Sequence, residues 1–192
     1  MTSRIRQSGR GDCCSLAHAS SALATLSVRA DVPEQEELSL LPFAVADLAG
    51  FHIDGVIRGR ALMLGEGSNP SDPAKAAADS GSVDARLLIA ALPGGPREAD
   101  DRANFARQTF GEIGGIKDVQ VTMSEPLRVN GQSGYQTMAA AKDARTGADL
   151  MVVQWLRFGS GGYLQMVGIA RADAWPSALA RLRVVRDSVD TK

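Results

Sequence analysis

The chain has few of the residues that most often carry catalysis or bind metals. Of its 192 residues, only two are cysteines and two are histidines. Cys13 and Cys14 are adjacent, so the chain after them has no disulfide, no thiolate nucleophile and no CxxC pair for a cysteine zinc site. His52 is the only histidine beyond residue 30, and a lone histidine in an apolar strand is structural more often than catalytic. We therefore predict no catalytic, cofactor-binding or metal-binding residues.

The chain also lacks a strong net charge and a long apolar run. Its formal net charge is −1, whereas nucleic-acid-binding domains are normally strongly basic. Three arginines, Arg181, Arg183 and Arg186, cluster near the C-terminus without interleaved aromatic residues, which is typical of a solvated helix face. No segment reaches the roughly 18 apolar residues of a membrane-spanning helix. We expect no nucleic-acid partner and no transmembrane segment.

The first 30 residues differ from the rest in charge and composition. They carry four arginines against the single Asp12, then a stretch from 13 to 28 rich in leucine, alanine and serine. Val28-Arg29-Ala30 precedes Asp31 in the manner of a small-residue cleavage site. This order favours a signal peptide and a periplasmic or secreted protein. The alternatives are a disordered tail or a wrongly assigned start, with a cytoplasmic protein. Asp12 and His18 make the apolar stretch less apolar than usual.

The remaining chain predicts one domain, with 31–42 as an extended linker or the lead into the first strand, and 43–190 as a single α+β unit. Within 43–131, apolar alternation and turn residues predict several strands and one helix. We expect strands within 43–57, at 61–65, 83–92, 117–123 and 127–129, a loop at 67–81 and a helix over 97–113. Glu125-Pro126 should interrupt one strand, and Asn130-Gly131 is a strong hairpin signal.

The segment from 132 to 189 predicts three strands and a closing helix. The strands, 132–142, 148–158 and 163–171, are joined by short turns, which makes them antiparallel neighbours. The helix should begin near Asp173 as a cap, with Pro176 in its first turn. Its apolar stripe consists of Trp175, Leu179, Leu182, Val185 and Val189.

The middle strands are apolar on both faces. In 148–158, Leu150, Val152 and Leu156 alternate with Met151, Val153 and Trp155. Such a strand is expected to be central in a sheet that is covered on both sides. We therefore predict an α+β fold with a largely antiparallel sheet sandwiched by helices. A covered sheet offers no open platform, so a partner should bind at loops, an edge or a helix flank. The 67–81 loop and the 157–163 turn are the candidates.

A family resemblance covers this C-terminal part best. The order Leu127, Asn130-Gly131, Gly134-Tyr135, a turn at Gly147, Gly161-Gly162-Tyr163-Leu164 and a helix ending Arg186-Asp187-Ser188-Val189 resembles PsbP-like and DcrB-like domains. That resemblance implies an antiparallel sheet sandwiched by helices, and a domain that is commonly extracytoplasmic in bacteria and thylakoids. It also implies an accessory or binding role, and it assigns no functional residue to this chain.

Other candidate groups have structural interpretations. Gly159 to Gly162 leads into a strand and lacks a following Lys-Ser/Thr, so it predicts a hairpin turn rather than a phosphate loop. Asp143 and Asp149 flank a turn and could bind a cation weakly. Both tryptophans, Trp155 and Trp175, are expected in the core. Four carboxylates, Glu98, Asp100, Asp101 and Glu112, should form the wet face of a helix.

The sequence thus predicts a non-enzymatic extracytoplasmic accessory or binding domain, without a cofactor and with a protein partner. Two alternatives stay open. One is a cytosolic protein-interaction module. The other is a small carboxylate-dependent hydrolase, because spacing alone does not exclude paired carboxylates.

Overall fold

The computed structural model describes residues 33–67 and 84–192. The predicted signal peptide or tail, and all of the predicted 67–81 loop except Gly67, lie outside these residues. The elements are α2 (Glu34–Ser39), β1 (Phe43–Val45), β2 (His52–Ile57), β3 (Ala61–Gly65), β4 (Arg86–Pro93), α4 (Arg102–Gly111), β5 (Ile116–Val129), β6 (Gln132–Asp143), β7 (Asp149–Phe158), β8 (Gly162–Arg171), α5 (Trp175–Asp187) and β9 (Val189–Thr191).

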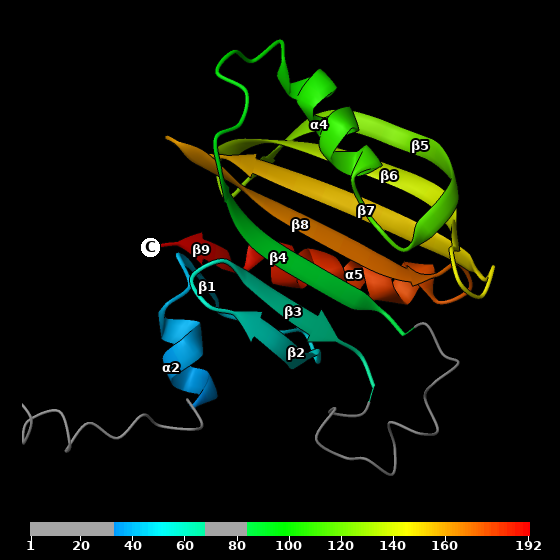
Figure 1. Ribbon diagram of the computed structural model, residues 1–192, viewed down its shortest axis with the longest axis horizontal. Helices are drawn as coiled ribbons and strands as arrows, with labels where there is room; N and C mark the ends of the chain where they lie inside the picture. Colours follow the sequence, from blue (N-terminus) through cyan, green and yellow to red (C-terminus); the bar gives the residue numbers. More distant parts are fainter. Residues whose placement is uncertain (1–32, 68–83) are drawn as a thin grey trace, which may run out of the picture. The chain divides into compact units, whose positions relative to one another are not determined.

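Seven of the strands form one sheet in the order β2-β3-β4-β8-β7-β6-β5 (Figure 1). Every neighbouring pair in this sheet is antiparallel. The short strands β1 and β9 pair with each other in a second, two-stranded sheet. The predicted α+β class with a largely antiparallel sheet is therefore confirmed.

The predicted hairpin turns are present, and local chemistry explains them. Asn130 and Gly131 have φ values of 49° and 76°, and two successive positive φ angles suit the tight turn that joins β5 and β6. Between β6 and β7, the Asp143 carboxylate accepts hydrogen bonds from the backbone N–H groups of Arg145 and Thr146, at 2.9 and 2.6 Å. These turns fix the register of the long central strands.

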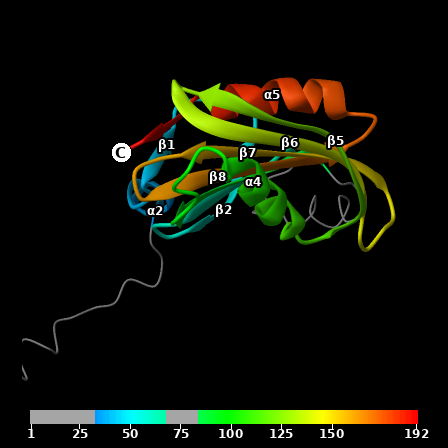
Figure 2. The same ribbon diagram turned by 90° about the horizontal axis from the view of Figure 1, so that it is seen from above.

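Helix α5 covers one face of the sheet, and α4 lies on the opposite side (Figure 2). Trp175, Ala178, Leu182 and Val185 of α5 are buried in a core that includes Trp155 of β7. The helix approaches β8 closely at Gly168, where an added Cβ would lie 2.8 Å from Leu182 Cδ1. This is the larger of the two apolar cores.

Helix α4 covers only part of its face. Phe110 packs in a small cluster with Ala139, Ala141, Val152 and Val167 of strands β6, β7 and β8. Among the residues that the structure describes, no helix lies over β2, β3 and β4 on this side. The prediction of a sheet sandwiched by helices is thus not confirmed across the whole sheet.

Several predicted element boundaries are wrong. Residues 34–39 form helix α2 rather than an extended linker, because Glu-Gln-Glu-Glu-Leu is a run of good helix formers. Helix α4 begins at Arg102 rather than at residue 97, since Asp100 and Asp101 favour turns over a helix interior. Strand β5 continues through Pro126, because β5 is an edge strand and an edge tolerates a missing N–H.

The end elements also differ from the prediction. Helix α5 ends at Asp187, and Val189 is buried as the first residue of β9 rather than as part of the helix stripe. Asp173 does not cap α5, because its carboxylate forms an ion pair with Arg171 at 2.6 Å. That hydrogen bond lowers the pKa of Asp173 below its usual range.

Candidate functional site

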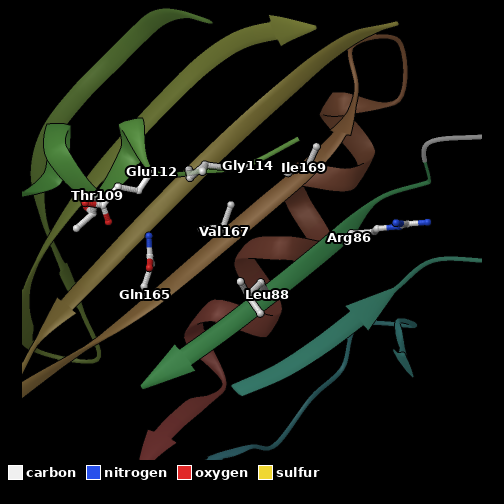
Figure 3. Close-up of a pocket in the computed structure, with 9 residues that line it drawn as sticks. Arg86, Leu88, Thr109, Glu112, Gly114, Gln165, Val167 and Ile169 are labelled. Carbon is white, nitrogen blue, oxygen red and sulfur yellow. The ribbon is translucent and has the colours of Figure 1, made fainter. Parts of the chain in front are cut away.

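A pocket of about 350 Å³ lies beside α4 on the incompletely covered face of the sheet (Figure 3). Its apolar wall consists of Leu88 of β4, Val167 and Ile169 of β8, and Ile113. Strand register explains this grouping, since Leu88 lies directly opposite Val167 in the β4–β8 pair. Met166 lies between the pocket residues Gln165 and Val167 of β8, so it points to the other side of the sheet and packs in the core beneath α5.

Exposed apolar side chains continue from the pocket across the neighbouring strands. Leu88 is 37% exposed, and Met63, opposite it on β3, is 38% exposed. Ile57 on β2 is 50% exposed and falls on the same face by strand alternation. We call the pocket together with Ile57, Met63 and Leu88 the open face. Its existence corrects the prediction that the sheet offers no open platform.

One side-chain amide, that of Gln165, lines the pocket, and it is linked to α4 through the buried Gln154. Gln154 of β7 is fully buried, and its Nε2 donates to the Ala106 carbonyl at 3.1 Å and to Thr109 Oγ1 at 3.0 Å. Gln165 of β8 donates to Gln154 Oε1 at 3.2 Å. Figure 3 shows Gln165 extending from β8 toward α4. These bonds tie α4 to the sheet and leave the Gln165 carbonyl oxygen able to accept a further hydrogen bond.

The lining also carries one charge of each sign. Glu112 follows the last residue of α4, and Arg86 is the first residue of β4. Figure 3 shows them on opposite sides of the pocket. A ligand group bound here would meet an apolar wall, an amide and two separate charges.

His52 has a partner that sequence reasoning missed. Its Nε2 lies 2.7 Å from Asp54 Oδ1, and both side chains are about a quarter exposed. The sequence contained a signal for this pair, because His52 and Asp54 are two residues apart and such residues share a face of a strand. A bulge between Ile53 and Gly55 modifies that spacing here. Within 33–67 and 84–192, no serine, threonine or cysteine side chain forms a hydrogen bond with His52.

Of the four carboxylates considered for a hydrolase, Glu112 lies at the other end of α4 from the remaining three. Asp101 and Glu112 occupy the two ends of α4, about 16 Å apart along the helix axis. Paired catalytic carboxylates of glycosidases are separated by roughly 5 to 9.5 Å. Glu98 and Asp100 are exposed in the turns before the helix.

The predicted weak cation site at Asp143 and Asp149 has another explanation. Asp143 is engaged by the turn amides, and the backbone N–H of Thr146 lowers the pKa of this carboxyl below its ordinary value near 3.8. In the described part of the chain, no group of three or more histidine, cysteine, aspartate or glutamate side chains could hold a metal ion.

On the α5 side, both tryptophans and two of the three clustered arginines pack against neighbouring side chains. Trp155 and Trp175 are buried as predicted, and Trp155 Nε1 donates to Gln136 Oε1 at 2.6 Å. The arginine cluster is only partly a solvated face. Arg183 is exposed, but Arg181 lies over Phe51 and Arg186 over Trp155, with 4.9 and 5.1 Å to the ring centroids.

Comparison with known proteins finds the fold but no sequence relative. Neither a family model nor a curated protein matches the chain. LpqN of Mycobacterium tuberculosis, described as involved in cell envelope biogenesis, matches with a TM-score of 0.53 and 13% identity over 78% of this chain and 83% of LpqN. PA94 of Pseudomonas aeruginosa, a protein of unknown function described as a putative regulator, matches with a TM-score of 0.50 and 13% identity over 69% of this chain and 83% of its own.

A PsbP protein of Synechocystis sp. PCC 6803 is also similar, with a TM-score of 0.45 and 11% identity over 77% of this chain and 95% of PsbP. The likeness to LpqN and PA94 concerns the fold alone, because both are only 13% identical to this chain. In the described ranges, no helix has the length and apolarity needed to cross a membrane.

Proposed function

We propose that this chain is a non-enzymatic accessory domain that acts outside the cytoplasm and binds a protein partner through the open face. The observation that carries the proposal is the row of exposed apolar side chains, Ile57, Met63 and Leu88, next to a pocket of about 350 Å³. An apolar surface rimmed by polar groups is typical of a protein-binding site.

The pocket's chemistry defines the partner segment. Its apolar wall suits one large apolar side chain, and the Gln165 carbonyl can accept a hydrogen bond from the backbone N–H beside that side chain. Glu112 and Arg86 would orient the segment, because they offer opposite charges on the two sides of the pocket. We therefore propose a segment with a bulky apolar anchor and flanking charges.

Two observations support a location outside the cytoplasm. The first 30 residues have the basic start, the alanine- and leucine-rich stretch and the small-residue site of a signal peptide. The fold is shared with LpqN, described as involved in cell envelope biogenesis. Expression in a bacterial host followed by intact-mass measurement tests this part. We expect a mature N-terminus at or near Asp31, and a full-length product in the cytosol would contradict it.

The binding part is tested by Leu88→Glu, which adds a charge to the open face without removing a buried side chain. The control is Val184→Glu, because Val184 is comparably exposed on the outer side of α5. Tagged wild-type and variant proteins are used to capture partners from the native envelope fraction, and the captured protein is then purified and its affinity measured. We expect Leu88→Glu to lower that affinity at least about tenfold and Val184→Glu to leave it unchanged.

Two results would contradict the proposal. One is an equal affinity of both variants and the wild type for the purified partner. The other is turnover of a small molecule by the purified domain, which would favour the hydrolase alternative. Melting temperatures of both variants must match the wild type, so that a loss of binding is not a loss of folding.

A further inference from the structure

Arg157, near the end of β7 and next to the turn that leads into β8, is a buried arginine without a carboxylate partner among the described residues. Arg157 is only 4% exposed. Its Nε donates to Gln132 Oε1 at 2.8 Å, one terminal nitrogen to the Val189 carbonyl at 2.7 Å, and the other to Thr191 Oγ1 at 3.1 Å. All three acceptors are neutral. Since a guanidinium has five N–H donors, two remain without a recorded acceptor.

No aspartate or glutamate side chain of the described residues forms an ion pair with Arg157. Among the residues that the structure describes, the ion pairs involve other arginines and His52, not Arg157. Asp190 lies between Val189 and Thr191 in β9, but strand alternation directs it to the other side, and it is exposed. A buried cation with neutral partners alone is costly, because hydrogen bonds offset only part of its lost hydration.

A cavity of about 300 Å³ adjoins this arginine. Its lining includes no aspartate or glutamate side chain, and it includes Lys192, whose Nζ donates to the Ser39 carbonyl at 2.9 Å. Ser160, in the turn between β7 and β8, also lines it and is exposed without a recorded hydrogen bond among the described residues. Gly162 also lines the cavity, and its backbone packs closely on β4, because an added Cβ there would lie 2.7 Å from the Leu92 carbonyl oxygen.

We propose that this cavity, which we call the Arg157 cavity, binds the oxyanion of a small molecule, either a carboxylate or a phosphate. The two remaining guanidinium N–H groups and the Ser160 hydroxyl would donate to its oxygens. Pro42, Leu92 and Leu164 provide an apolar wall for the rest of the ligand. The Arg157 cavity is separate from the open face, so this proposal does not rest on the proposed function.

The turn next to the Arg157 cavity lies within 157–163, one of the two segments that the sequence predicts as candidates for binding a partner. Gly159 to Gly162 was predicted to be a hairpin turn rather than a phosphate loop, and the hydrogen bond from Gly159 N–H to the Gly162 carbonyl at 2.9 Å fits that turn. The oxyanion would be held by Arg157 on the strand before the turn, not by glycine amides at a helix N-terminus. The proposed oxyanion site therefore depends on Arg157 lying in β7, where it lines the cavity.

The test measures anion binding to the full chain with inorganic phosphate and with acetate as probes. Thermal unfolding is followed in low-millimolar phosphate, acetate or chloride at matched ionic strength, and isothermal titration gives the affinity. We expect phosphate or acetate to raise the melting temperature by about 5 °C at saturation, relative to chloride. A response to phosphate alone identifies a phosphoryl ligand, and a response to acetate alone identifies a carboxylate ligand.

Ser160→Glu places a carboxylate in the lining without removing any hydrogen bond of Arg157. We expect this variant to lose the anion response, because its own carboxylate competes for the guanidinium. Ser177→Glu adds the same charge on the exposed first turn of α5 and should respond like the wild type. The proposal is overturned if the wild type melts at the same temperature in all three salts, or if Ser160→Glu responds as strongly as Ser177→Glu. Either result would leave Arg157 as a structural link between β7 and β9.

Discussion

The two faces of the sheet are built from the same strands but are closed in different ways. On the α5 side, Leu87 of β4 is buried against a large apolar core. On the α4 side, its neighbour Leu88 is more than a third exposed and borders a pocket. Two consecutive residues of one strand thus differ: Leu87 is part of the core, and Leu88 is exposed to solvent.

The helices differ in the same way. Helix α5 docks through tryptophan, leucine and valine side chains, whereas α4 is attached by a small apolar cluster and by the buried amide of Gln154. Directional hydrogen bonds position α4 without covering the whole face. The comparison teaches that one face buries most of the apolar side chains, while the other leaves apolar side chains exposed beside a pocket.

The largest expected effect is on the α5 side. Trp175→Ala should lower the free energy of unfolding by about 3 to 5 kcal/mol, because it empties a buried site at the start of the helix. Urea unfolding measures this change. Val184→Ala, on the exposed side of α5, should stay within about 0.5 kcal/mol. A loss under about 1 kcal/mol for Trp175→Ala would mean that α5 does not dock as described.

Loss of the amide that holds α4 should have an intermediate effect. Gln154→Ala should cost about 1 to 3 kcal/mol, because it removes two donated bonds in a buried site and leaves the Gln165 amide without its acceptor. Hydrogen exchange should accelerate in α4 more than in α5. The control is Gln108→Ala on the exposed side of the same helix. Equal acceleration in both helices would contradict the separate attachment of α4.

Leu88→Ala should have a small effect on stability. Because Leu88 is partly exposed, we expect a loss below about 1 kcal/mol, against about 2 to 5 kcal/mol for Leu87→Ala. Both variants are compared by urea unfolding under one set of conditions. Similar losses of unfolding free energy for Leu87→Ala and Leu88→Ala would show that Leu88 is buried in solution, which would contradict the open face.

The smallest effect concerns pH and the hairpin that joins β6 and β7. The pKa of Asp143 is lowered in the folded protein, so its stabilising contribution is present above the ordinary value near 3.8 and is lost as the pH falls through the folded value. Asp143→Ala should reduce the difference in urea midpoint between about pH 6 and about pH 3. Asp149→Ala is the control, and an unchanged difference in Asp143→Ala would contradict the turn's role.

Short-range signals allowed most elements to be predicted. Asn130-Gly131 and Asp143 to Gly147 determine their turns through local backbone chemistry, and the two-sided apolar pattern of 148–158 correctly identified a central strand. Pro126 was misinterpreted as a break, because its tolerance depends on β5 being an edge strand. That position is a property of the sheet order and not of the local sequence.

The candidate sites were harder to predict, since each depends on long-range register. The open face exists because α4 begins at Arg102 and covers β6 rather than β3 and β4. The Arg157 cavity depends on β9, which places Val189 and Thr191 beside Arg157. The helix pattern predicted from the sequence had included the first residue of this strand, Val189. Only the His52–Asp54 pair had a local signal, the spacing of two residues within one strand.

The edges of the main sheet bear on how this protein behaves at high concentration. Strand β5 pairs on one side only, and Val119, Val121 and Met123 are exposed along it. Such an edge invites another chain to add a strand, which is a common route to aggregation. Two bulges and the missing N–H of Pro126 interrupt its row of donors, and the opposite edge strand, β2, carries a bulge as well. Both ends of the sheet are therefore poor templates for fibre growth.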